Sequence, residues 1–185
     1  MISFIFDEKQ ATEAMVFLLS LNGGNMSCMK VIKMLYLADR YSMSNGHGSI
    51  TTDSYISLPD GPASSNILDC IRWNSGVEWK KHIRTNGNLV EISYPIKHYE
   101  KLSRYYMETL SNVYERFKDY NLEELESCCR SLGEWKNPHG SSMPISIESI
   151  IENSVSKDKR ADVLDELEEC SFVQQSNLKI EMRTI

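Results

Sequence analysis

One stretch constrains the fold of this chain more than any other: residues 27–43, SCMKVIKMLYLADRYSM. Apolar side chains recur on nearly every side of the helix that this stretch predicts, and they leave only a narrow polar strip. A helix with so little polar surface must be covered by other parts of the protein. Ser27 is a suitable N-cap, and Asn45-Gly46 is a suitable stop. The sequence therefore predicts a central helix.

The polar residues of this helix need partners, because an unpaired polar or charged group is costly to bury. Lys33, Tyr36 and Arg40 are three and four residues apart and so share a face, with Asp39 roughly 60° away. Two interpretations stay open. In the first, Asp39 and Arg40 bond to backbone groups of residues 53–61 and hold the fold. In the second, Tyr36 and Arg40 are anchors of a protein interface, since these residue types often dominate binding energy.

A glycine–proline step follows the central helix. Residues 50–58 are rich in β-branched and aromatic side chains and predict a short strand or extended segment. Pro62 suits the first position of the next helix, with Gly61 as its N-cap. The Asp60-Gly61-Pro62 loop is then either a fixed helix start or an edge that offers a free helix N-terminus to an anionic group of a partner.

Local signals divide the rest of the chain into further elements. We predict a first helix capped by Asp7 with Gln10, a hairpin over 79–94, a long helix over 98–120, a helix from Asn121 to Leu132, helices starting at Ser146 and Ser156, and a tail over 172–182 that forms a last strand or stays loose. The fold class is mainly α, a compact single-domain helical fold with a small β-hairpin or sheet (α+β). The domain covers 1–185, with 155–185 as a candidate C-terminal extension.

Composition narrows the setting in which the chain works. Of its 185 residues, 41% are hydrophobic and 25% are charged, and no stretch approaches the roughly 20 apolar residues of a membrane helix. The start of the chain lacks the basic region of a signal peptide, and five cysteines without C-x-x-C spacing indicate reduced thiols. We therefore expect a cytoplasmic protein without membrane contact.

The net charge of −6 opposes direct nucleic-acid binding, which depends on clustered Lys and Arg. The acidic excess is concentrated in residues 97–185. That half of the chain presents either an ordinary solvated surface or a docking surface for a basic partner.

Enzymatic chemistry finds little support in the sequence. The four histidines are scattered: His47, His82, His98 and His139. The adjacent Cys128 and Cys129 are poorly placed to chelate one metal together, so we expect no metal and no cofactor. Cys70 with His82 or His139 is the remaining nucleophile pair, and a small Cys-dependent hydrolase stays an alternative. Cysteine on an apolar helix face is more often a core residue, so we expect no enzyme.

Three segments, taken in their order along the chain, resemble the Panacea domain, also called the SocA-like antitoxin domain. They are KVIKMLYLADR at 30–40, ITTDSY at 50–55 and DGP at 60–62. Members of the family carry a basic-aliphatic helix ending in Leu-Tyr-x-Ala-Asp, a turn, an extended segment and a Gly-Pro step. A later family loop has His, Pro and Trp in that order, whereas here Trp135 precedes Pro138 and His139.

The resemblance implies an antitoxin that binds and neutralises a cognate protein toxin. The alternative is a proteolytic adaptor or a phage-borne regulator that engages a protease or chaperone, since one relative hands its toxin to a protease. The candidate partner-binding residues are Tyr36, Arg40, Asp60, Gly61, Pro62 and Trp135. The candidate structural residues are Lys33, Leu35, Ala38 and Asp39.

Overall fold

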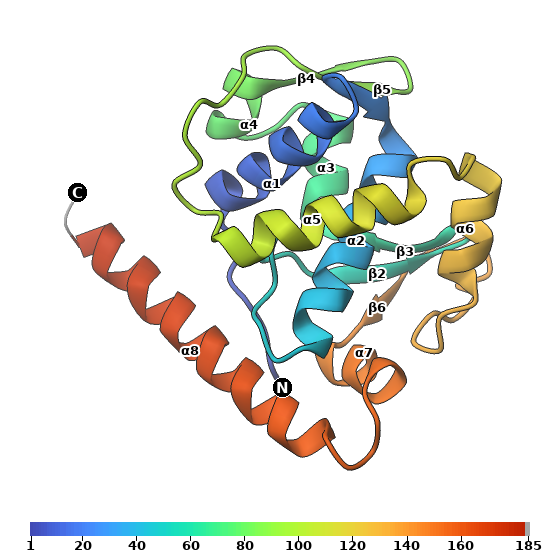
Figure 1. Cartoon of the computed structure of the whole chain (residues 1–185), viewed down its shortest axis with the longest axis vertical. Coiled ribbons are helices and arrows are strands. Elements are labelled where there is room, and N and C mark those ends of the chain that lie inside the picture. Colours follow the sequence, from blue (N-terminus) through green and yellow to red (C-terminus); the bar gives the residue numbers. More distant parts are fainter. Residues whose placement is uncertain (184–185) are drawn as a thin grey trace.

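The structure is a computed structural model that describes residues 1–183, with side chains described through residue 180. Its centre is helix α2 (Cys28–Ser44), and most of the side chains of α2 are buried. Ser27 caps α2 by accepting a hydrogen bond from the Lys30 N–H. Helices α1 (Glu8–Leu21), α5 (Arg104–Phe117), α6 (Leu122–Arg130) and α7 (Ile147–Ser154) all pack against α2 (Figure 1). The predicted central helix is confirmed.

Several helix starts follow local capping signals. Asp7 accepts from the Gln10 N–H at the start of α1, and Ser146 accepts from the Ser149 N–H at the start of α7. Asn121 and Glu124 form a reciprocal capping box at α6. Each cap satisfies N–H groups that would otherwise lack a partner within the helix. These starts lie where the sequence predicts them.

Two small antiparallel sheets complete the fold. The first has the strand order β1 (Asn25–Ser27), β5 (Leu89–Ile92), β4 (Ile83–Asn86), and the second has the order β3 (Gly61–Ser64), β2 (Tyr55–Leu58), β6 (Met143–Ile145). In the second sheet Leu58 pairs with Gly61, so Pro59 and Asp60 form the turn of a tight hairpin. The mainly helical α+β class is confirmed.

The predicted helix start at Pro62 is wrong. Residues 61–64 pair with β2, and helix α3 (Ser65–Trp73) begins after them. Asp53 fixes this start from a distance, because its carboxylate accepts hydrogen bonds from the Asn66 N–H at 2.8 Å and the Ile67 N–H at 2.9 Å. The acceptor that a helix start needs is thus supplied by a residue far upstream in sequence.

Three further boundaries differ from the prediction. The first predicted hairpin strand begins instead with helix α4 (Val77–His82), where Glu8 accepts a hydrogen bond from the Trp79 N–H. Helix α5 starts only after Ser103, which accepts from the Tyr106 N–H. The tail belongs to helix α8 (Arg160–Arg183), a segment that contains neither glycine nor proline to end it.

The core divides into two clusters on either side of α2. The larger one joins α1, α2, α5 and the first sheet, and the smaller one contains Tyr36 and Met43 with apolar residues of α7 and α8. Helix α8 runs along one side of the body, with the C-terminus at its far end (Figure 1), and hydrogen bonds join it to the N-terminal segment. None of the helices over residues 1–183 is both long enough and apolar enough to cross a membrane.

Candidate functional site

Two of the predicted residues meet at one buried carboxylate, that of Glu134. Its Oε1 accepts hydrogen bonds from the Tyr36 hydroxyl at 2.8 Å and from Arg40 Nε at 2.6 Å. The Glu134 side chain is fully buried, whereas that of Arg40 is 20% exposed. The sequence analysis missed Glu134, although two donors on one face of a buried helix require an acceptor and the unusual 134–140 loop offers this one.

Arg40 also joins elements beyond this pair. Its Nη2 lies 3.4 Å from Glu134 Oε2 and donates to the Asn153 carbonyl oxygen at 3.1 Å. Arg40 therefore fastens both the loop after α6 and the end of α7 to the central helix. A guanidinium held by three hydrogen bonds has little rotamer freedom left to lose when a partner binds.

Asp39 lies on another side of α2 and holds the chain just after the helix. Its Oδ1 accepts from the Ile50 N–H at 2.7 Å and the Thr51 N–H at 2.9 Å, and the Thr51 hydroxyl donates to Oδ2. Burial raises the pKa of Asp39 to about 6, against the lowering effect of these hydrogen bonds. Asp39 thus bonds to backbone groups as predicted, but at residues 50–51 and not at 53–61.

The backbone of the Gly-Pro step is held instead by Lys33. Its Nζ donates to the Gly61 carbonyl oxygen at 2.8 Å and to the Pro62 carbonyl oxygen at 2.9 Å. Lys33 is fully buried, and burial lowers its pKa to about 8. Gly61 is required here, because its φ is +108° and an added Cβ would lie 2.9 Å from the Cβ of Cys129.

The remaining predicted residues differ in exposure. Asp60 is exposed at the hairpin turn, whereas Gly61 and Pro62 are buried, as is Tyr36. Trp135 is half-buried, and its indole Nε1 donates to the Leu58 carbonyl oxygen at 2.9 Å. Because Tyr36, Gly61 and Pro62 are buried in this conformation, they can affect a binding surface only indirectly, by positioning the exposed residues around them.

Arg40 reaches the surface at a groove of about 540 Å³ between α2, α5 and α6, called here the α2 groove. Tyr41, whose side chain is 52% exposed, lies beside Arg40 on its rim, and Arg116 lies on the α5 side. Apolar side chains also line it: Leu37, Val113, Phe117 and Leu132. Tyr41 is not among the residues singled out from the sequence, and the signal that could have found it is its position next to Arg40 on the helix.

Two features of the described residues bear on the metal and nucleophile alternatives. Among residues 1–183 no group of three or more His, Cys, Asp or Glu side chains is arranged to hold a metal ion. Burial raises the pKa of Cys70 to about 11 and that of Cys129 to about 12. A cysteine nucleophile needs the opposite shift, toward the thiolate. The Cys-dependent hydrolase alternative therefore gains no support.

These features define a class of protein: a helical scaffold whose buried polar residues fix a surface groove of mixed apolar and cationic character. The sequence model of the family described as antitoxin SocA-like, Panacea domain, matches residues 31–136. This is more than half of the chain, and the chain belongs to this family. No curated protein and no solved structure gives a match. The matched part contains most of α2 together with Glu134 and Trp135, whereas α7 and α8 lie beyond it.

Proposed function

We propose that this chain is an antitoxin that binds a protein toxin directly and blocks it, and that the α2 groove is part of the contact surface. Membership of the SocA-like antitoxin family supports the toxin–antitoxin role. The observation that supports the surface is the pair of Arg40, held by the buried Glu134, and the half-exposed Tyr41 beside it. An arginine that is already held in place binds with a small loss of conformational entropy, and tyrosine is a residue type that often dominates binding energy.

The lining of the groove indicates which part of a toxin would fit. Val113 and Phe117 provide apolar surface, and the Arg116 guanidinium lies 5.4 Å from the centre of the Phe117 ring. Arg40 and Arg116 place two cationic side chains at the rim. A toxin segment that combines an apolar side chain with a carboxylate would satisfy both features. Binding of this segment would then block the toxin directly, without its delivery to a protease.

The role is tested by growth. A neighbouring reading frame should encode a protein that stops growth when expressed alone and is harmless when co-expressed with this chain. If no such neighbour depends on this chain for neutralisation, the antitoxin role is refuted. A toxin whose half-life falls in the presence of the chain would indicate delivery to a protease in place of occlusion.

The surface is tested by Tyr41→Ala in a calorimetric titration of the purified toxin. We expect affinity to fall by about tenfold or more, because a tyrosine that acts as a binding hot spot contributes about 2 kcal/mol or more. The melting temperature should stay within about 2 °C. Tyr94→Ala, at a side chain that is also well exposed but lies after β5, is the matched control and should bind like the parent. If Tyr41→Ala binds the toxin with full affinity, the α2 groove is not part of the contact surface.

A further inference from the structure

A second groove runs between α8 and the body of the domain. Its larger part has a volume of about 500 Å³ and its smaller part about 380 Å³. Gln10, Gln174 and Asn177 line both parts, so the two form one continuous depression, called here the α8 groove. Its walls come from α8, the start of α1 and the loop after α2, which are distant in sequence.

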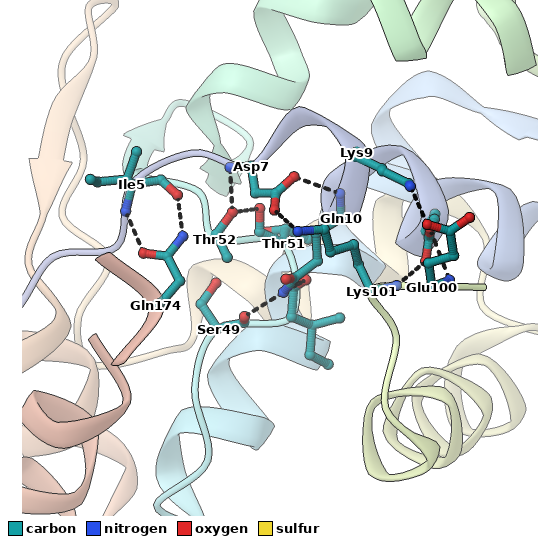
Figure 2. A network of polar contacts seen from close by, with 12 residues as sticks. Ile5, Asp7, Lys9, Gln10, Ser49, Thr51, Thr52, Glu100, Lys101 and Gln174 are labelled. Atoms are coloured by element: carbon teal, nitrogen blue, oxygen red, sulfur yellow. Dashed lines mark hydrogen bonds and ion pairs between the residues drawn. The ribbon is translucent and has the colours of Figure 1, made fainter. Parts of the chain in front are cut away.

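The walls of the α8 groove are fixed by hydrogen bonds to the N-terminal segment. The Gln174 side chain accepts from the Ile5 N–H at 3.1 Å and donates to the Ile5 carbonyl oxygen at 2.6 Å. The Asp7 N–H donates to the Thr52 hydroxyl oxygen at 2.8 Å. Figure 2 shows the segment from Ile5 to Asp7 held between Gln174 of α8 and the loop that carries Thr52. The groove is therefore formed before any partner arrives.

One end of the α8 groove is acidic. Glu166 and Glu169 line it, and neither has an ion pair with another of the described residues. Asp162, exposed one turn before Glu166, extends the negative charge along the helix. The Glu166 carboxylate lies against Gly46, in the space that a Cβ at Gly46 would occupy.

Next to this acidic end the lining is apolar. Phe4 and Tyr106 line the groove from the body, and Val173 lines it from α8 with more than half of its side chain exposed. Phe172 is also exposed on the adjoining surface of α8. Exposed apolar surface beside uncompensated carboxylates is the counterpart of a segment that carries both basic and apolar side chains.

We infer that the α8 groove binds a basic, partly apolar segment of a partner protein. Lys or Arg side chains of that segment would face Glu166 and Glu169, and an apolar side chain would face Val173. A second copy of this chain is a poorer occupant, because two chains of net charge −6 repel each other. The groove depends on α8, which lies outside the residues that the family model matches. Only the identification of that partner as a toxin rests on the proposed function.

The experiment uses the full chain and a phage-displayed library of random 16-residue peptides. We expect the enriched peptides to carry net positive charge together with apolar residues. Their affinity, measured by fluorescence anisotropy, should fall with added salt and should fall by about tenfold or more in the Glu166→Lys/Glu169→Lys variant. Val173→Glu should weaken the same peptides.

The matched control is Asp69→Lys/Asp119→Lys, which makes the same change in net charge at exposed positions on α3 and after α5 and should bind like the parent. If circular dichroism shows that the Glu166→Lys/Glu169→Lys variant has lost helix content, the Glu166→Gln/Glu169→Gln variant is used in its place. That variant removes the two charges without reversing them. No enrichment, enrichment of neutral or acidic peptides only, or undiminished binding to the groove variants would overturn the inference. A chain that enriches groove-binding peptides but fails to neutralise a toxin refutes the antitoxin role alone, whereas neutralisation without such peptides refutes the groove alone.

Discussion

Helices α2 and α8 use their polar residues in opposite ways. In α2, Lys33 and Asp39 are fully buried, and each has hydrogen-bond partners in another segment. In α8, Glu169 is exposed without an ion pair among the described residues, while Gln174 joins the helix to the N-terminal segment. Lys33, Asp39 and Gln174 hold the fold through these hydrogen bonds, whereas the exposed Glu169 carboxylate is available to a partner.

The difference bears on how such a protein can change its partner. A buried polar residue cannot be replaced without leaving its partners unsatisfied, so the region around α2 must change slowly. An exposed carboxylate on α8 can be replaced at little cost to folding. The family match covers most of α2 and stops before α8.

The largest effect should come from Asp39→Ala. This change leaves the Ile50 N–H, the Thr51 N–H and the Thr51 hydroxyl without their buried acceptor. Each unsatisfied buried donor costs about 1–3 kcal/mol, so we expect the free energy of unfolding to fall by about 3–5 kcal/mol. Urea denaturation measures it. Asp69→Ala, at an exposed position on α3, should change stability by less than about 0.5 kcal/mol. A loss below about 1 kcal/mol for Asp39→Ala would show that the loop re-forms its bonds elsewhere.

Arg40→Ala should cost somewhat less. It leaves the buried Glu134 carboxylate with the Tyr36 hydroxyl as its remaining side-chain donor. Breaking a buried ion pair costs about 3–5 kcal/mol, and the partial exposure of Arg40 reduces this to about 2–3 kcal/mol. The double change Arg40→Met/Glu134→Gln removes the buried charge but keeps an acceptor for the Tyr36 hydroxyl, and it should recover at least half of the loss in urea denaturation. If it recovers none, the unpaired charge of Glu134 is not the cause of the loss in Arg40→Ala. Arg40→Ala alone is therefore a poor test of binding.

The pH dependence of stability tests whether the buried Lys33 behaves differently from an exposed lysine of α8. Burial lowers its pKa in the folded chain to about 8, from 10.5. Between these values the unfolded chain binds the proton that the folded chain has released, so the free energy of unfolding rises as the pH rises. From pH 8 to pH 10 we expect a gain of about 2 kcal/mol, measured by urea denaturation.

Two variants assign this gain to Lys33. In Lys33→Met the rise should be absent, whereas Lys179→Met, on the exposed side of α8, should keep it. Parallel pH profiles for the parent and Lys33→Met would mean that the buried ammonium does not titrate in this range. The Gly61 and Pro62 carbonyl oxygens would then hold it charged throughout.

The sequence predicted the features that depend on near neighbours. The caps at Asp7, Ser27 and Asn121 use acceptors and donors within three residues of each other, and all three were read correctly. The shared face of Tyr36 and Arg40 also follows from helix geometry alone. Such features need no knowledge of the tertiary fold.

What the sequence left open depends on partners that are distant along the chain. Glu134 is 94 residues from Arg40, and Asp53 caps α3 from 13 residues away, so no local pattern marks either pair. Lys33 was assigned a structural role without its acceptors, which lie 28 and 29 residues downstream. The tail is a different case: a last strand or a loose segment is predicted over 172–182, whereas the absence of glycine and proline from 160–183 favours the one continuous helix that the structure has.

The smallest effect should come from Phe172→Gln on α8. The Phe172 side chain is 72% exposed, so its replacement removes little packing, and the free energy of unfolding should change by less than about 0.5 kcal/mol. Leu167→Ala on the same helix removes a fully buried side chain and should cost about 2–4 kcal/mol in the same urea titration. A loss above about 1 kcal/mol for Phe172→Gln would mean that this side of α8 is packed in solution, and α8 would then resemble α2. A neutral result leaves Phe172 exposed without a structural role, as expected of a residue that a partner covers.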